Sequence, residues 1–474
     1  MRTIRAIRNT YVPVNRLPPE ILSKVLEYRT DERDLVGATH VCQYWRSTLI
    51  SSPSLWTCFP FRSNPNLDQT LTFLERSKSA PIDLIDIDTR LVESPQGFEV
   101  LEHLAPHITR TKSLLIMGPH GTHTTSLLFC HPAPFLQCLQ LYSEERHVRL
   151  PDNFLGRQAP SLRFVRFSGI CPTFKSPFPL PNLTEFFLYL LDDGGSISMD
   201  ALFRFLSDSP LLQKIHITAG GQTMQDTFLD QVTLLESLVE LEYGCNLAAR
   251  VLPFLKLPRL QRLEVFSPGP RQAQKLADTL PHNGRALLAR ATGMVYYSDE
   301  SLLRIDLYGN GIDVSLSVTG NPVPVTVDWF SDQACIPFGQ IEELTIEASP
   351  VSAVFPIGVF ILENLRVLRA NLWDAEFAEE LFRLFHPDPE AGVPCRSLQE
   401  IKCGGQDFQD PRTPVARPLI RPLVHLAKKR KQAGYQLRAV SLMIEDSFDQ
   451  GSVEELKEHV GEVRIERWDM RRYP

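Results

Sequence analysis

The sequence lacks the features by which several protein classes are recognised. No window of its 474 residues is apolar over the roughly 20 residues that a membrane-spanning helix needs, so we expect no membrane partner. Positive charge is not in excess either. The chain has 49 Lys and Arg against 56 Asp and Glu, a formal net charge of -7, and we therefore expect no nucleic-acid partner.

Paired cysteine motifs are also missing. The nine cysteines are scattered from Cys42 to Cys403 without a CxxC pair, which argues against a disulfide framework. Several of them, including Cys138 and Cys245, lie in apolar runs, so we expect reduced, buried thiols in a cytoplasmic and/or nuclear protein. The basic N-terminus has neither the apolar core nor the cleavage site of a secretory signal, and we expect residues 1–13 to form a disordered arm.

Catalytic motifs are lacking as well. The sequence contains no phosphate loop, dinucleotide fingerprint, nucleophile elbow or HExxH, and we expect a non-catalytic protein without cofactor or metal. One alternative stays open, because His120, His123, Cys130 and His131 could begin the metal site of an enzyme. The run KKRK at 428–431 fits either the end of a helix that starts near Pro418 or a nuclear-import signal.

What the sequence does contain begins with a short apolar segment. In VNRLPPEILSKVLEY, residues 14–28, apolar side chains recur at steps of three and four after two prolines, which predicts a helix. A second short helix is expected after Asp34, and a third carries Val41, Trp45 and Leu49. Three such helices within residues 15–57 cannot cover all their apolar surface, so we expect them to contact another protein.

The blocks LPPEIL…VL, VCQYWR and SPSLW, in this order, resemble the F-box motif over residues 14–58. The resemblance implies a domain that docks on a small Skp-type adaptor, and through it on a cullin, in a ubiquitin ligase. The alternative is a three-helix cap that only closes the following domain. The residues that the resemblance and the apolar pattern assign to adaptor binding are Leu17, Pro18, Ile21, Leu22, Val25, Trp45, Leu55 and Trp56.

From residue 80 onward the pattern Leu-x-x-Leu-x-Leu recurs, with Ile, Val or Phe allowed. Instances start at residues 82, 136, 162, 183, 212, 238, 260, 302, 341, 365, 398 and 437. The steps from 136 to 260 are those of leucine-rich repeats, and the longer steps that follow indicate insertions near 267–300 and 311–340. Only Asn246 and Asn310 supply the asparagine that such repeats carry, so the array is irregular.

These patterns predict an α/β fold, with an N-terminal three-helix F-box followed by an irregular leucine-rich-repeat solenoid over residues 59–474. One unit cannot bury its apolar face alone, so the units must stack. The alternative is an ordinary α/β domain whose strands happen to follow Pro-x-Leu.

The residues between the apolar positions of each strand are expected to face outward, on the concave side of the repeats. Aromatic side chains among charges are typical of protein interfaces. The alternative is that a loop or a neighbouring strand covers the aromatic side chains. The residues predicted to bind a target protein are Tyr142, Phe164, Arg166, Phe187, Tyr189, His216, Glu242, Arg262, Asp306 and Tyr308.

We therefore expect a substrate-recognition subunit of an SCF-type ubiquitin ligase, with the F-box docked on its adaptor and the repeats bound to a target protein. FLERSKSAPIDLIDI soon after the F-box resembles the expanded sets of such proteins in mushroom-forming fungi. The alternative is a repeat protein that acts as a binding scaffold outside a ubiquitin ligase.

Overall fold

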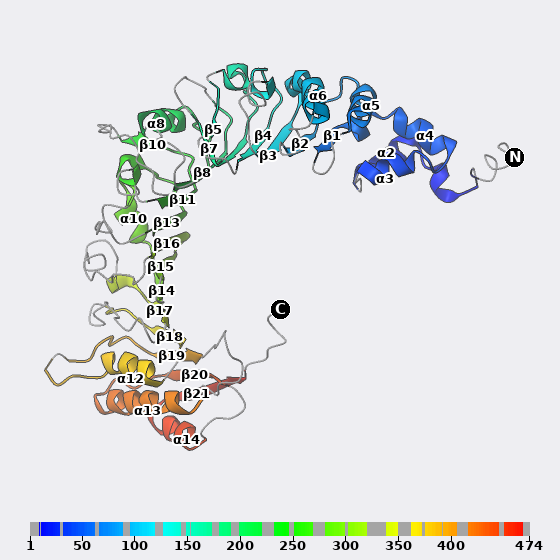
Figure 1. The fold of residues 1–474 in the computed structure, drawn as a ribbon. Helices are drawn as coiled ribbons and strands as arrows, with labels where there is room; N and C mark the ends of the chain where they lie inside the picture. Colours follow the sequence, from blue (N-terminus) through cyan, green and yellow to red (C-terminus); the bar gives the residue numbers. More distant parts are fainter. Residues whose placement is uncertain are drawn as a thin grey trace. The chain divides into compact units, whose positions relative to one another are not determined.

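The structure is a computed structural model. It describes residues 9, 11–28, 32–61, 66–88, 95–118, 127–143, 148–151, 153–172, 180–190, 199–219, 232–245, 251–268, 280–298, 302–319, 338–348, 362–371, 375–390, 392–404, 416–444 and 450–467. The chain divides into two compact units, Met1–Leu229 and Asp230–Pro474, both of mixed α/β structure. In the first unit a helical region precedes the sheet (Figure 1).

The helical region opens with short elements. Pro13 and Pro19 stand at the first turns of η1 and α2, where a missing backbone N–H costs no hydrogen bond. Most of the predicted arm, residues 1–13, lies outside the described residues. The elements are η1 (Pro13–Arg16), α2 (Pro19–Glu27), α3 (Glu32–Ala38), α4 (Gln43–Ile50) and η2 (Pro53–Trp56). Their buried apolar side chains are Leu22, Leu35, Ala38, Leu49, Leu55 and Trp56.

A parallel sheet follows in the first unit. Its strands pair in the order β1 (Cys58–Phe61), β2 (Leu84–Asp88), β3 (Ser113–Met117), β4 (Cys138–Tyr142), β6 (Phe164–Ser168), β8 (Glu185–Leu190) and β9 (Lys214–Ala219). The helices α5 (Leu67–Ser77), α6 (Pro95–Leu104) and α8 (Met199–Ser207) lie on one side of it (Figure 1). The connections also contain η4 (Ala105–Arg110), η5 (Phe154–Arg157) and the strand pair β5 (Val148–Arg149) and β7 (Ile170–Cys171).

The strands are entered through a recurring turn, which explains the Pro-x-Leu pattern. The backbone N–H of the first leucine bonds the carbonyl three residues earlier, as Leu136 does to Ala133 and Leu162 to Ala159. The backbone N–H of the next residue then donates to the carbonyl of the residue just before the preceding strand. The N–H of Arg163, for example, donates to the carbonyl of Gln137 at 2.9 Å. In the repeats that start at residues 136, 162, 183 and 212, the three apolar positions are buried, while the residues between them stay partly exposed.

The sheet of the second unit is mixed. Its strands pair in the order β11 (Glu240–Cys245), β13 (Arg262–Pro268), β16 (Ile312–Thr319), β15 (Leu302–Gly309), β14 (Gly293–Ser298), β17 (Glu343–Ala348), β18 (Val367–Asn371), β19 (Glu400–Gly404), β20 (Ala439–Ile444) and β21 (Glu462–Arg467). β15 runs antiparallel to β14 and β16, and the other pairs are parallel.

The antiparallel strand corrects the expectation that residue 302 begins another repeat. Gly309, Asn310 and Gly311 all have positive φ and turn the chain back, and Gly309 pairs with Ile312 across a two-residue loop. Asn310 therefore belongs to a hairpin, not to an asparagine position of a repeat. The two segments expected as insertions also contribute strands to the sheet, namely β14 and β16.

Helices cover one side of the second unit's last strands. They are α12 (Ala375–Leu384), α13 (Ala416–Gln432) and α14 (Gln450–His459), and α13 contacts both of the others (Figure 1). The unit also contains α10 (Gly284–Leu288), η6 (Leu252–Phe254), η8 (Phe338–Gln340) and the strand pair β10 (Thr233–Leu234) and β12 (Leu255–Lys256). Among the residues that the structure describes, no helix has the length and apolar character to cross a membrane.

The KKRK run lies in the last turn of α13, as predicted for a helix end. Arg430 within it is fully buried, so the folded chain does not present the run as a continuous basic surface. The expectation of buried thiols was wrong in part. Cys395 is buried and Cys138 half-buried, but Cys58 and Cys130 are exposed because they lie at the edges of their elements.

Candidate protein-binding surfaces

The outer side of α2 carries an exposed apolar row. Ile21 is 49% exposed, Val25 is 50% exposed and Tyr28 is 81% exposed. They stand four and three residues apart, so they share one face of the helix. Leu22 is instead buried in the helical core, and Leu26 is half-buried. The helix therefore has two apolar faces, and its own chain covers only one.

The neighbouring helices extend this apolar character. Val36 on α3 is exposed, and Val41, in the turn before α4, is 59% exposed. Several exposed apolar side chains on one small domain are a mark of protein contact sites. We call Ile21, Val25, Tyr28, Val36 and Val41 the helical patch.

The start of α2 is held by two aromatic side chains from α4. The Tyr44 hydroxyl donates to the carbonyl of Leu17 at 2.5 Å, and the Trp45 indole N–H donates to the Asn15 side chain at 2.6 Å. Leu17 and Trp45 are half-buried, and Pro18 is exposed. These contacts fix where Pro18 and the following turn stand on the surface.

Three residues predicted to bind the adaptor are buried in the core of the helical region. Leu22, Leu55 and Trp56 are at most 7% exposed. The Trp56 indole N–H donates to the carbonyl of Leu49 at 2.9 Å, and its ring meets Phe73 edge-on at 4.9 Å between centroids. These residues stabilise the domain and do not form its surface.

The open face of the first sheet, opposite its buried leucines, carries an aromatic cluster around one arginine. The Arg166 guanidinium lies 4.7 Å from the Phe187 ring, 5.7 Å from Phe164 and 6.0 Å from Tyr189. Its Nη1 donates to the Tyr142 hydroxyl at 3.2 Å. Such contacts between a cation and aromatic rings stabilise the guanidinium on this face.

Strand register explains how these side chains meet. Arg166 on β6 is level with Phe187 on β8, which is level with His216 on β9. The rings of Tyr189 and His216 lie 4.4 Å apart, and the His216 Nε2 is 3.0 Å from the Thr218 hydroxyl. The structure thus brings together six of the predicted target-binding residues on one face: Tyr142, Phe164, Arg166, Phe187, Tyr189 and His216.

The other four predicted residues lie on the open face of the second unit. Arg262 pairs with Glu240 at 3.0 Å, and Asp306 pairs with Arg304 at 2.7 Å. Burial, and then the charge of Glu240, raises the pKa of Glu242.

Tyr308 lies flat over the glycine opposite it. It is level with Gly293, and its hydroxyl is 3.4 Å from the Glu343 carboxylate. Burial, and then Glu343, raises the pKa of the Tyr308 phenol.

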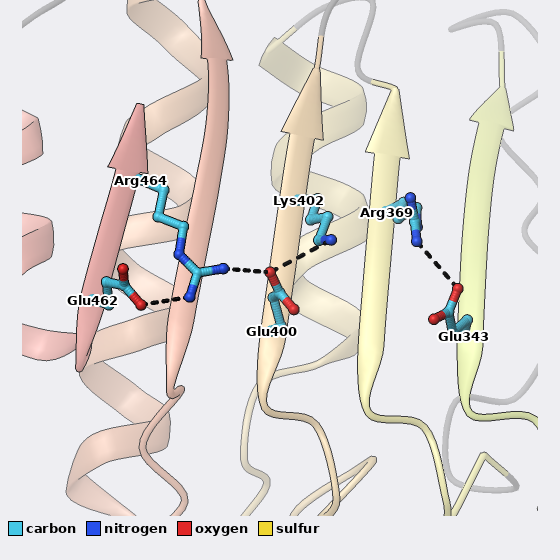
Figure 2. Close-up of polar contacts among 6 residues, drawn as sticks. All are labelled: Glu343, Arg369, Glu400, Lys402, Glu462 and Arg464. Carbon is cyan, nitrogen blue, oxygen red and sulfur yellow. Dashed lines mark hydrogen bonds and ion pairs between the residues drawn. The ribbon is translucent and has the colours of Figure 1, made fainter. Parts of the chain in front are cut away.

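A ladder of ion pairs continues along the same face and was missed from the sequence. Arg369 pairs with Glu343 at 3.2 Å, and Arg464 pairs with Glu462 at 2.6 Å and with Glu400 at 3.5 Å (Figure 2). Lys402 also reaches Glu400, at 3.6 Å (Figure 2). The sequence did hold a sign of these ion pairs, because the charged residues occupy outward positions of the strand pattern. Their pairing joins strands up to 64 residues apart, which no local pattern reveals.

The candidate metal site lies partly outside the described residues, which exclude His120 and His123. Cys130 is exposed and His131 is half-buried. Within the ranges that the structure describes, no group of three or more His, Cys, Asp or Glu side chains could hold a metal ion.

A model of the F-box-like family matches residues 14–62. The matched segment includes α2, α3, α4, η2 and β1, and so contains the helical patch. The chain therefore carries an F-box-like domain where the sequence predicted one. No curated protein sequence matches the chain.

Proposed function

We propose that the chain is the substrate-recognition subunit of an SCF-type ubiquitin ligase. The observation that carries this proposal is the F-box-like domain with an exposed helical patch on α2. F-box domains generally bind Skp-type adaptors, which link them to a cullin. The helical patch is the surface that the adaptor would cover, together with Pro18.

In this proposal the sheets act as an irregular leucine-rich-repeat solenoid whose open face binds a target protein. Support comes from the recurring turn and strand, and from the ten predicted residues on the open faces, where each is at least partly exposed. The subunit itself would be non-catalytic and would act in the cytoplasm and/or nucleus. Its contribution would be proximity, because it holds the target near the ligase's catalytic partners.

Co-purification with a Skp-type adaptor tests the first half. We expect the wild-type chain to retain the adaptor and the double variant Ile21→Asp/Val25→Asp to lose it. Both positions are half-exposed, so the double variant should still fold. The matched control is Leu211→Asp, a similarly exposed leucine in the turn before β9, which should bind as wild type does.

Failure of the intact, folded chain to bind the adaptor would contradict the ligase role. A repeat protein acting as a scaffold outside a ligase would then be the better description.

A further inference from the structure

Arg166 has an unusual electrostatic environment. It is half-buried at the centre of β6, and three aromatic rings exclude water from much of its guanidinium. Its Nη1 donates to the Tyr142 hydroxyl, and its Nε is buried without a hydrogen-bond partner among the described residues. A guanidinium carries several N–H donors, and the described residues supply an acceptor to Nη1 alone. A partly desolvated cation of this kind favours an anion beside it.

Arginines on the open face of the second unit differ from Arg166 because they have carboxylate partners. Each of four has a carboxylate within ion-pair distance: Arg262 with Glu240, Arg304 with Asp306, Arg369 with Glu343, and Arg464 with Glu462. Across the described residues, no carboxylate makes such a pair with Arg166. Glu185, on the next strand, is level with Lys214 instead. Arg166 is thus an open-face arginine whose anion the described chain does not supply.

We propose that the Arg166 surface, formed by Tyr142, Phe164, Arg166, Phe187, Tyr189 and His216, binds an extended peptide segment through an anionic group that pairs with Arg166. This inference rests on the proposed function, in which the open face binds a target protein. The anionic group is a carboxylate or a phosphate. The surrounding rings contact apolar side chains on either side of that group, as aromatic residues do at interface hot spots.

The dimensions and charge favour a short peptide segment. The four strands β4, β6, β8 and β9 span about 14 Å, which an extended segment of about four or five residues crosses. A single-stranded nucleic acid would also stack on aromatic rings, but it needs a groove of several cations along its backbone. The Arg166 surface offers one central cation, with Lys214 facing Glu185 at its edge.

Binding of the full-length chain to a peptide array tests the proposal. The array carries peptides with Glu, phosphoserine or Gln at a fixed central position, and mixtures of Leu, Val, Phe and Tyr around it. We expect wild-type protein to prefer the Glu or the phosphoserine series over the Gln series by about tenfold or more. The preferred series identifies the anion.

Variants of Arg166 test whether the preference for anionic peptides arises at the Arg166 surface. Arg166→Gln should abolish the preference, and Arg166→Lys should keep part of it. Arg383→Gln, which removes a carboxylate-paired arginine from the helix α12 and not from the open face, should leave it unchanged. Circular dichroism checks that each variant is folded.

Equal binding of the three series, including no detectable binding, overturns the proposal, as does a preference that survives Arg166→Gln. Displacement of bound peptides by a thymidine oligonucleotide would also overturn it, in favour of nucleic acid.

A further variant separates this inference from the proposed function. If Phe187→Ala weakens every series while Arg166→Gln changes none, the face binds protein without selecting an anion. If neither variant alters peptide binding, the target-binding role of the face is itself wrong.

Discussion

Substitutions of Trp56 can show whether this residue stabilises the core of the F-box-like domain or contacts the adaptor. Replacing a buried tryptophan by alanine costs about 3–5 kcal/mol, from lost burial and from the cavity left behind. Trp56 is 0% exposed, its N–H bonds the Leu49 carbonyl, and Arg76 stacks on its ring at 4.3 Å. We therefore expect Trp56→Ala to lower the stability of the helical region by about 4 kcal/mol.

Trp56→Phe is the matched control. It keeps an aromatic ring against Phe73 but removes the indole N–H and its hydrogen bond to the Leu49 carbonyl, which still accepts the backbone N–H of Ser52 at 3.2 Å. That loss costs about 1–2 kcal/mol. Hydrogen exchange of amides in α4, η2 and α5 is the assay, because a chain of two units has no single unfolding free energy.

Adaptor affinity provides the second readout. Trp56→Phe should change it by less than about twofold, because the helical patch is intact. Ile21→Asp/Val25→Asp should abolish it without altering the exchange rates. If Trp56→Ala instead leaves amide protection unchanged and abolishes adaptor binding, Trp56 contacts the adaptor and our assignment of it to the core is wrong.

Three further predictions concern the second unit. Arg430→Met should lower the stability of α13, measured by amide hydrogen exchange, by about 3 kcal/mol. The reason is that the buried guanidinium donates to the carbonyls of Phe385, Pro394 and Cys395. The control Lys431→Met should lower this stability far less. Burial, and then Lys429, lowers the pKa of His386 to about 4, so below its ordinary pKa of 6.5 the unfolded chain takes up a proton that the folded chain does not. As the pH is lowered from 6.5 to about 4, the stability of this region should therefore fall, and His386→Asn should flatten that fall in the amide protection factors of α12 and α13. Gly293→Ala should weaken β14 by about 1–3 kcal/mol in hydrogen exchange, because its Cβ would stand 2.2 Å from the Tyr308 ring.

The alternation of residues along the strands was predictable, and it placed Arg166 and its neighbours correctly. A strand repeats every two residues, so the buried leucines at fixed positions decide which side chains face outward. The same rule cannot give strand direction. The LLRIDL pattern at 302 reads alike in a parallel or an antiparallel strand. The cue for the antiparallel one was the GNG turn at 309–311, a hairpin signal outside the repeat pattern.

Partners that lie far apart in the sequence were not predictable. Trp56 could equally be an exposed anchor or a core residue, because its residue type suits both. Its burial depends on Phe73 and Arg76, which come from a helix beyond the first strand. The ion pair of Arg464 and Glu400 likewise depends on strand register.

The junction after Trp56 bears on how the chain would work. β1 begins two residues after Trp56 and pairs at once with β2. The Thr57 hydroxyl contacts the Asp83 carboxylate at 2.6 Å, and the Thr57 carbonyl accepts the N–H of Asp83. The F-box-like domain therefore runs into the first sheet without a linker. A receptor that acts by proximity gains most when its two binding surfaces keep a fixed separation, because a flexible linker spreads the bound target over a larger volume. The tryptophan that the sequence suggested as a docking residue would then serve docking indirectly, because its contacts with Phe73 and Arg76 join the end of the helical region to α5.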